Sequence, residues 1–166
     1  MPLAIVSIGL PGSGKTTLLS AIAEQYGLIR INKDEIRGEL FGDIHDQSHN
    51  QEVWEESNRR IRAMLEAGQG VILDNTNLER WKRAEVIELL RAAGASPIIG
   101  VVFEVPAEVA RERNRSRATS VKEDVMEWME KKLLEEPPEL SEGFDVLYTH
   151  GELGKALGDA GTDLFD

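Results

Sequence analysis

The 166-residue chain contains no cysteine, few aromatic residues and no long apolar run. Without cysteine, it can form neither disulfide bonds nor thiolate metal sites, and its three histidines are too scattered for a metal site. No run approaches the ~18 apolar residues of a transmembrane helix. The N-terminus lacks the charged start and the small-residue cleavage site of a signal peptide. These absences predict a cytoplasmic protein with no membrane partner.

Basic residues are also scarce: 19 lysines and arginines stand against 30 acidic residues, for a formal net charge of -11. This balance argues against a protein that coats nucleic acid non-specifically. One short segment nevertheless holds four arginines, Arg111, Arg113, Arg115 and Arg117. Either this segment is a solvated helix face with local ion pairs, or a strongly anionic ligand binds there.

Short apolar runs alternate with helical periodicity along the chain. Strands are predicted at 3–9, 28–31, 69–74 and 97–105, with a weaker one at 144–148. Helices are predicted at 16–26, 50–67, 78–93, from Pro106, and at 120–136, where Ser120 and Glu123 make a capping-box pattern. The alternation predicts an α/β domain at 1–150, with a parallel sheet flanked by helices and ligands bound beyond the carboxyl ends of its strands. The glycine-rich tail, 151–166, is expected to be partly disordered.

The segment GLPGSGKT, from Gly9 to Thr16, matches the phosphate-loop pattern G-x-x-x-x-G-K-[ST] between a predicted strand and helix. We expect a nucleoside triphosphate, ATP, to bind through the residues of this loop and the first turn after it: Gly12, Ser13, Gly14, Lys15, Thr16 and Thr17. Lys15 is predicted to bridge the outer phosphates and Thr16 to ligate Mg²⁺. Asp74 ends the strand at 69–74 and is predicted to support the same metal, with a turn or cap aspartate as the alternative.

The phosphate acceptor is predicted to bind near 30–40, which follows the second strand. Asp34 and Arg37 are three residues apart and share a helix face. A hydroxyl acceptor needs a carboxylate to take its proton, a role for Asp34, and Arg37 can hold an anionic group of the acceptor. The alternative is that Asp34 caps a helix and pairs with Arg37.

The arginine-rich segment is predicted to form a small helical lid. On a helix, Arg113 and Arg117 share one face, while Arg111 and Arg115 share another, where Glu108 can pair with Arg111. We expect Arg113 and Arg117 to bind the nucleotide phosphates and Arg117 to act catalytically, stabilising the transferred group as the lid closes. A purely solvated helix is the alternative.

These blocks together resemble the polynucleotide 5′-kinases of bacteriophages and bacteria, over about residues 3–137. The blocks are GLPGSGKTT, INKDEIRGEL, GVILDNTNLERWKR and ERNRSRATSVKEDVM. The resemblance implies a phosphate-loop NTPase fold of the nucleoside-monophosphate-kinase type. It implies that Asp34 is the general base, that Arg37 holds the acceptor phosphate, and that the R-N-x-x-R arginines are Arg113 and Arg117. It also implies that Thr76 and Asn77 lie near the acceptor.

The sequence departs from the family at Asn75, where some members carry an acid, and it holds no D-x-D-x-T phosphatase signature. The resemblance implies ATP- and Mg²⁺-dependent transfer to a hydroxyl, and the favoured acceptor is the 5′-OH end of DNA or RNA. A small-molecule or hydroxymethylpyrimidine kinase with the same machinery is the nearest alternative. A regulatory ATPase without an acceptor is the other.

Overall fold

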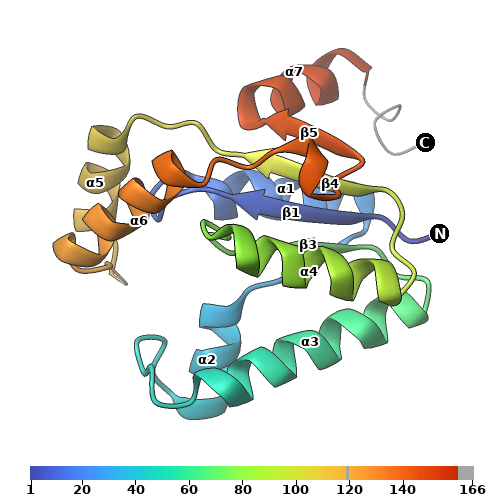
Figure 1. The fold of residues 1–166 in the computed structure, drawn as a ribbon, viewed down its shortest axis with the longest axis horizontal. Helices are drawn as coiled ribbons and strands as arrows, with labels where there is room; N and C mark the ends of the chain where they lie inside the picture. The colour runs from blue at the N-terminus through green and yellow to red at the C-terminus, as the bar shows by residue number, and fades with distance from the viewer. Residues whose placement is uncertain (119, 161–166) are drawn as a thin grey trace.

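The computed structural model describes residues 1–118 and 120–160, which form five strands and seven α-helices (Figure 1). The elements in chain order are β1 (Ala4–Ile8), α1 (Lys15–Tyr26), β2 (Ile29–Ile31), α2 (Lys33–Phe41), α3 (Asn50–Glu66), β3 (Val71–Leu73), α4 (Arg80–Ala92), β4 (Ile98–Val102), α5 (Ala107–Arg115), α6 (Glu123–Glu135), a short 3-10 turn at Leu140–Glu142, β5 (Val146–Thr149) and α7 (His150–Ala160). Each predicted strand is present.

The strands form one parallel sheet in the order β2-β3-β1-β4-β5. Because side chains alternate along a strand, the sheet has two apolar faces. Ala4, Val6 and Ile8 point toward α2, α3 and α4. Ile5 packs on the opposite face against α1 and α7, with Leu19 of α1. The predicted α/β fold with both faces covered is therefore confirmed.

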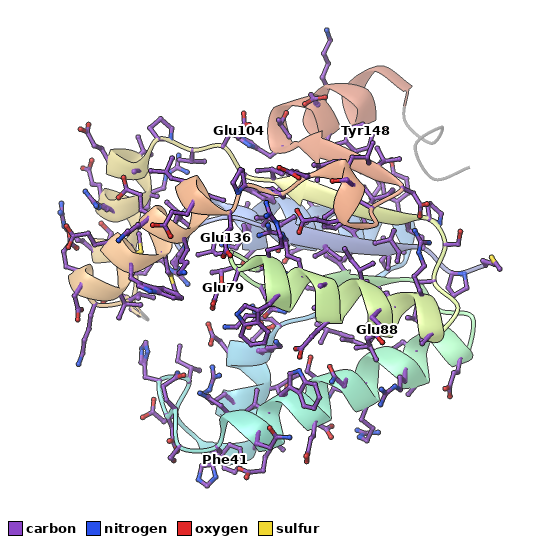
Figure 2. The ribbon with its side chains drawn as sticks, in the orientation of Figure 1. Phe41, Glu79, Glu88, Glu104, Glu136 and Tyr148 are labelled. Atoms are coloured by element: carbon purple, nitrogen blue, oxygen red, sulfur yellow. The ribbon has the colours of Figure 1, made fainter. Side chains whose placement is uncertain are left out.

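The lid helices α5 and α6 lie beyond the carboxyl ends of the strands (Figure 1). A third, small apolar cluster joins them to the rest of the molecule: Leu10, Leu78, Ala110 and Met126. On the other side of this edge lies α2, where the ring of Phe41 stacks on His49 at 3.9 Å and ties the helix to the loop before α3 (Figure 2). The phosphate loop thus lies between two helical arms.

One local prediction needs correction. The helix predicted from Ser120 begins at Glu123 instead, with Lys122 as its cap residue and no side-chain cap. The segment before α6 is bonded to α5 instead, because the Asn114 side chain bonds to both the N–H and the carbonyl of Val121. The Ser120–Glu123 capping box is therefore not formed.

The sequence reasoning missed a helix in the tail, where His150–Ala160 form α7, and the expected partial disorder of 151–166 stays a prediction. Thr149 and Glu152 form the reciprocal bonds of a capping box, and Leu153 is buried against the sheet. The T-x-x-E pattern at 149–152 was the sequence signal for this helix. Residues 161–166 lie outside the described chain, and the division of the chain at residue 150 stays a prediction. Within residues 1–118 and 120–160, no helix is long and apolar enough to cross a membrane.

Candidate functional site

The phosphate loop connects β1 to α1, as the motif predicts. Gly14 caps α1 in the left-handed conformation with φ 87°, which favours glycine. Gly12 also has a positive φ, and a Cβ there would lie 2.4 Å from the carbonyl oxygen of Ala110 in α5. The glycine at position 12 therefore lets the loop pack directly against the lid helix.

Lys15 is held inside the loop by its own backbone. Its ammonium donates to the carbonyls of Gly9 at 3.1 Å and Leu10 at 2.7 Å, and the side chain is buried. Burial lowers the pKa of Lys15 to about 8, with Asp74 acting in the opposite direction and Arg117 adding to the decrease. A bound phosphate would place negative charge beside the ammonium and so favour the charged form of Lys15, which burial disfavours.

Other nucleotide-binding candidates lie around the same loop. Ser13 is buried, and its hydroxyl has no hydrogen-bond partner among the described residues. Thr17 is exposed in the first turn of α1. These placements fit a ligand at the loop, and their contacts with a nucleotide stay predictions.

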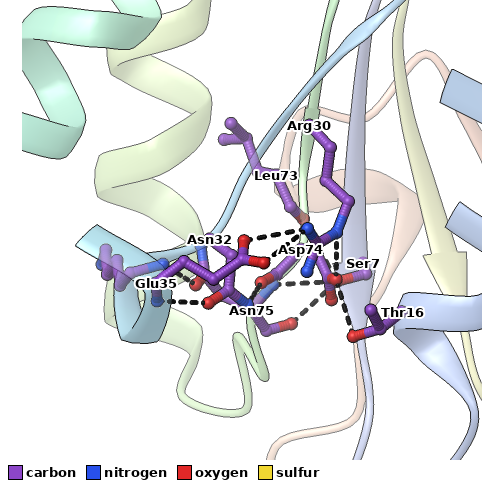
Figure 3. Close-up of polar contacts among 9 residues, drawn as sticks. Ser7, Thr16, Arg30, Asn32, Glu35, Leu73, Asp74 and Asn75 are labelled. Carbon is purple, nitrogen blue, oxygen red and sulfur yellow. Dashed lines mark hydrogen bonds and ion pairs between the residues drawn. The ribbon is translucent and has the colours of Figure 1, made fainter. Parts of the chain in front are cut away.

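Thr16 and Asp74 meet at the carboxyl edge of the sheet, although they are far apart in the sequence (Figure 3). The Thr16 hydroxyl donates to Oδ2 of Asp74 at 3.0 Å, and Asp74 is 1 % exposed. A hydroxyl and a carboxylate are hard oxygen donors of the kind that Mg²⁺ takes, together with substrate phosphates and water. The two side chains therefore fit the predicted metal, in the ATP-bound state where the phosphates complete its ligands.

Arg30 joins this metal candidate to the acceptor helix, a role that the sequence reasoning missed. Its Nε donates to Oδ2 of Asp74 at 2.7 Å, and its Nη1 bonds to Glu35 in α2 (Figure 3). Asn32 adds a second link, because its amide donates to the Asp74 carbonyl at 2.6 Å and its oxygen caps α2 at Glu35. In the sequence, the one feature that could have pointed to this network was a polar residue at the end of the strand β2.

Asn32, and not Asp34, is therefore the cap residue of α2, which removes one of the two alternative roles of Asp34. The carboxylate of Asp34 does pair with Arg37, at 2.5 Å, and remains 62 % exposed. Arg37 is only 8 % exposed and also donates to the Ile44 carbonyl and to Asn50. Its Nε is buried with no partner among the described residues.

The loop after β3 is held tightly to the neighbouring strand. The Thr76 carbonyl accepts from Gly9 N–H at 3.0 Å, and the Asn77 amide donates to the Ser7 carbonyl at 2.9 Å. The backbone of Asn77 has a positive φ of 45°. The sequence reasoning missed Arg83, which supports the backbone at this position. The Arg83 guanidinium is fully buried and donates to the carbonyls of Asn77 and Leu78. The predicted acceptor contacts of Thr76 and Asn77 stay predictions.

Three of the four arginines lie on α5, whereas Arg117 follows the end of that helix at Arg115 and its cap residue Ser116. Arg111 pairs with Glu130 of α6, and Arg115 pairs with Glu123 at 2.9 Å. The expected Glu108 partner for Arg111 is thus replaced by an acid of the facing helix, because α5 and α6 pack together. These two arginines therefore join the lid helices.

Arg113 and Arg117 are exposed, and neither side chain makes an ion pair or hydrogen bond within residues 1–118 and 120–160. They line a cavity of about 410 Å³ with Val109, Glu112 and Ser116. The Arg113 guanidinium lies 3.8 Å from the position that a Cβ would take at Gly14, and Arg117 is near enough to lower the pKa of Lys15. Both free guanidinium groups are therefore next to the phosphate loop.

A comparison with known proteins assigns this chain to a family. Residues 5–137 match the AAA domain family. A segment is 33% identical over 87 residues to the uncharacterized protein Rv2004c of Mycobacterium tuberculosis (strain ATCC 25618 / H37Rv), which is 45% of this chain and 17% of that protein. The chain thus spans under a fifth of the length of that relative.

Solved structures extend the likeness to most of the chain. The Pnkp1/Rnl/Hen1 RNA repair complex contains a chain with a TM-score of 0.71 and 24% identity, covering 81% of this chain and 44% of that one. A putative kinase from Chloroflexus aurantiacus has a TM-score of 0.68 and 20% identity, covering 89% and 87%. A shikimate kinase from Bacteroides thetaiotaomicron has a TM-score of 0.56 and 18% identity, covering 94% of each chain. The chain therefore belongs to the AAA domain family, and it has a phosphate-loop kinase fold that resembles the polynucleotide kinases.

Proposed function

We propose that this protein transfers the γ-phosphate of ATP to the 5′-hydroxyl end of a nucleic acid. The observation that carries the proposal is the Asp34–Arg37 pair, at 2.5 Å, on the helix that follows β2. An exposed carboxylate beside a buried, multiply bonded guanidinium suits an acceptor with a hydroxyl and a neighbouring phosphate. Both groups lie beyond the same sheet edge as Lys15.

On the nucleotide side, the loop N–H groups and the helix N-terminus bind the β-phosphate. The Lys15 ammonium bridges the outer phosphates. Thr16 and Asp74 hold Mg²⁺, which neutralises charge on the phosphates when it is bound. Because Thr16, Asp74 and Arg30 are already joined by hydrogen bonds, little rearrangement of this part is required.

On the acceptor side, the hydroxyl proton passes to the Asp34 carboxylate while the oxygen bonds to the γ-phosphorus and the bond to ADP breaks. Arg37 holds the acceptor phosphate, and Thr76 and Asn77 border it. Arg113 and Arg117 contact the transferring group from the lid, where their charge is most effective once water is excluded.

Two observations support a nucleic acid as the acceptor. The R-N-x-x-R and N-K-D-E-I-R blocks resemble those of polynucleotide kinases, and the fold matches that of a chain in the Pnkp1/Rnl/Hen1 RNA repair complex. We also propose a cytoplasmic location, where ATP is available. A small-molecule kinase is the second candidate, because a gluconokinase from Sinorhizobium meliloti shares the fold with a TM-score of 0.54 and 22% identity over 89% of this chain and 81% of that one.

The test is an acceptor panel. The protein is incubated with γ-labelled ATP, Mg²⁺ and either 5′-OH DNA, 5′-OH RNA, nucleosides, hydroxymethylpyrimidines or sugars. The proposal expects label on the oligonucleotide ends. Label on a sugar or free base alone would establish the small-molecule alternative, and phosphate release with no labelled acceptor would establish an ATPase.

A further inference from the structure

All three tryptophans of the chain are partly exposed, although tryptophan is among the most apolar side chains. Trp54 is 40% exposed, Trp81 55% and Trp128 46%. Trp54 comes from α3, which packs against the acceptor helix α2, and Trp81 comes from α4, which packs against α3, whereas Trp128 is on the lid helix α6. The first two are therefore candidates for contact with an acceptor, and the third offers a control.

Trp81 lies in the first turn of α4, directly after the loop at 75–79. Its indole N–H donates to Glu79 at 2.8 Å, and the Lys82 ammonium lies 5.5 Å from its ring centroid. In the view of Figure 2, Glu79 lies between the lid helices and α2. The ring edge is thus fixed by a hydrogen bond while much of the ring stays exposed.

A hydrogen bond ties the start of the acceptor helix to the loop that precedes α4, because the Lys33 backbone N–H donates to the Asn75 side chain at 3.0 Å. Burial lowers the pKa of Lys33, and the Lys82 ammonium lowers it further, while Glu85 has the opposite effect. Lys82 and Glu85 therefore lie within electrostatic reach of Lys33, which adjoins Asp34. Trp81 precedes Lys82 and is one helical turn from Glu85, so it borders the same space.

Trp54 borders this space from α3. Asn50, the first residue of α3, accepts a hydrogen bond from Arg37 at 3.2 Å, and Trp54 follows it by one helical turn. On one flank of α3, the Arg60 side chain donates a hydrogen bond to Glu39 of α2. Trp54 lies on the other flank of the buried stripe, and α3 packs against α4 as well as α2.

One of the two rings has a cation beside it, because the Lys82 ammonium lies 5.5 Å from the centroid of Trp81, and Lys82 also pairs with Glu79. Arg37 pairs with the acceptor carboxylate of Asp34, and the ammonium of the preceding residue, Lys33, has no hydrogen-bond partner among the described residues. Exposed aromatic faces combined with cations along a backbone path are the usual means of binding a single strand, because every base has a π-face.

We propose that Trp81 and Trp54 stack the first two bases of a single-stranded acceptor. Trp81 takes the 5′-terminal base, beside the loop at 75–79, and Trp54 takes the second base, beyond the phosphodiester held by Arg37 and Lys33. This inference rests on the proposed function, because it assumes that the acceptor is a nucleic acid end. It adds that recognition extends to the bases and requires an unpaired end.

The test measures transfer from γ-labelled ATP to a short single-stranded 5′-OH oligonucleotide and to copies with an abasic nucleotide at position 1 or 2. The variants are Trp81→Leu, Trp54→Leu and the control Trp128→Leu. Stacking predicts that Trp81→Leu raises KM for the intact strand by about tenfold, within the range of base–aromatic stacking, with little change in kcat. The loss should vanish on the strand that is abasic at position 1. Trp54→Leu should behave likewise for position 2.

Trp81→Phe keeps a stacking face and should restore most of the affinity, which separates stacking from a folding defect. Trp128→Leu should match the wild type. An equal loss for Trp81→Leu on intact and abasic strands, or a wild-type KM, would overturn the stacking assignment while the kinase proposal stands. Labelling of sugars alone by the wild-type protein would overturn both.

Discussion

Lys15 of the phosphate loop and Arg117 of the lid present positive charge to the same phosphates in the proposed reaction, but the two side chains are held very differently. The Lys15 ammonium is buried and bonded to two backbone carbonyls. The Arg117 guanidinium is exposed and makes no polar contact within residues 1–118 and 120–160. One cation is therefore positioned before the ligand arrives, and the other becomes positioned by binding it.

The lid is nevertheless not loose throughout. Arg111 pairs with Glu130, Arg115 pairs with Glu123, and buried Asn114 bonds to both backbone groups of Val121. These contacts fix α5 against α6, so that the lid can move as one piece. The difference between the two regions predicts that changes in the phosphate loop affect both ATP binding and transfer, whereas changes in the lid or at Asp34 affect mainly transfer.

The largest effect is expected for Lys15→Ala. It removes the buried ammonium, so that ATP binding weakens and transfer falls by about 10³-fold or more, at or above the loss seen for a single oxyanion-hole donor. Calorimetric ATP binding and labelled transfer measure the two quantities. Lys131→Ala removes an exposed lysine of α6 and should leave both unchanged. Normal turnover in Lys15→Ala would contradict the whole assignment of this site.

Arg117→Ala tests the lid. The arginine acts on the charge that develops in the transition state, so kcat should fall by about 10²- to 10³-fold while ATP affinity changes little. Arg115→Ala is the matched control, because that side chain pairs with Glu123 at an exposed position and such pairs contribute little. If both variants lost activity equally, the division of the arginines between two faces would be wrong.

Asp34→Asn tests the acceptor side. The amide keeps the size of the carboxylate but cannot take the hydroxyl proton, so transfer should fall by about 10²-fold. ATP affinity and melting temperature should stay at wild-type values, because Asn32 and not Asp34 caps α2. Asp124→Asn, in the first turn of α6, is the control acid. Loss of ATP binding together with transfer would indicate a structural role for Asp34.

Sequence reasoning was most successful where the backbone itself forms the site. The phosphate loop, its flanking strand and helix, and all five strands follow from glycine positions and apolar runs. The same holds for the division of the lid arginines, because the four-residue spacing separates Arg113 and Arg117 from Arg111 and Arg115, although α5 itself ends at Arg115.

What the sequence could not provide are contacts between segments far apart in the chain. Arg30 bonds to Asp74, and Arg83 is fully buried beneath the loop that holds Asn77. An arginine in a charged helix is normally expected at the surface, and only the tertiary packing shows that Arg83 satisfies buried carbonyls. The bond from Asn114 to Val121, which removes the Ser120 capping box, is likewise set by the way α5 and α6 meet.

The smallest expected effect is a pH dependence that belongs to the phosphate loop and not to the lid. Burial lowers the pKa of Lys15 to about 8 in the free protein, whereas bound phosphates favour its charged form. ATP binding should therefore take up a proton, and the affinity should be constant below pH 7 and fall by about tenfold between pH 7 and 9. Lys15→Arg, whose charge persists, should abolish this decline.

The same ionisation has the opposite sign in the stability of the ligand-free protein. Between about pH 8 and the ordinary lysine pKa of 10.5, the unfolded chain binds more protons at Lys15 than the folded chain does. This group alone therefore makes the free energy of unfolding rise with pH in that window, while ATP affinity falls. Comparing wild-type protein with Lys15→Met in denaturant titrations from pH 7.5 to 10 isolates the contribution, since methionine cannot ionise. Identical pH slopes for the two proteins would show that Lys15 is not held in the desolvated setting that separates it from Arg117.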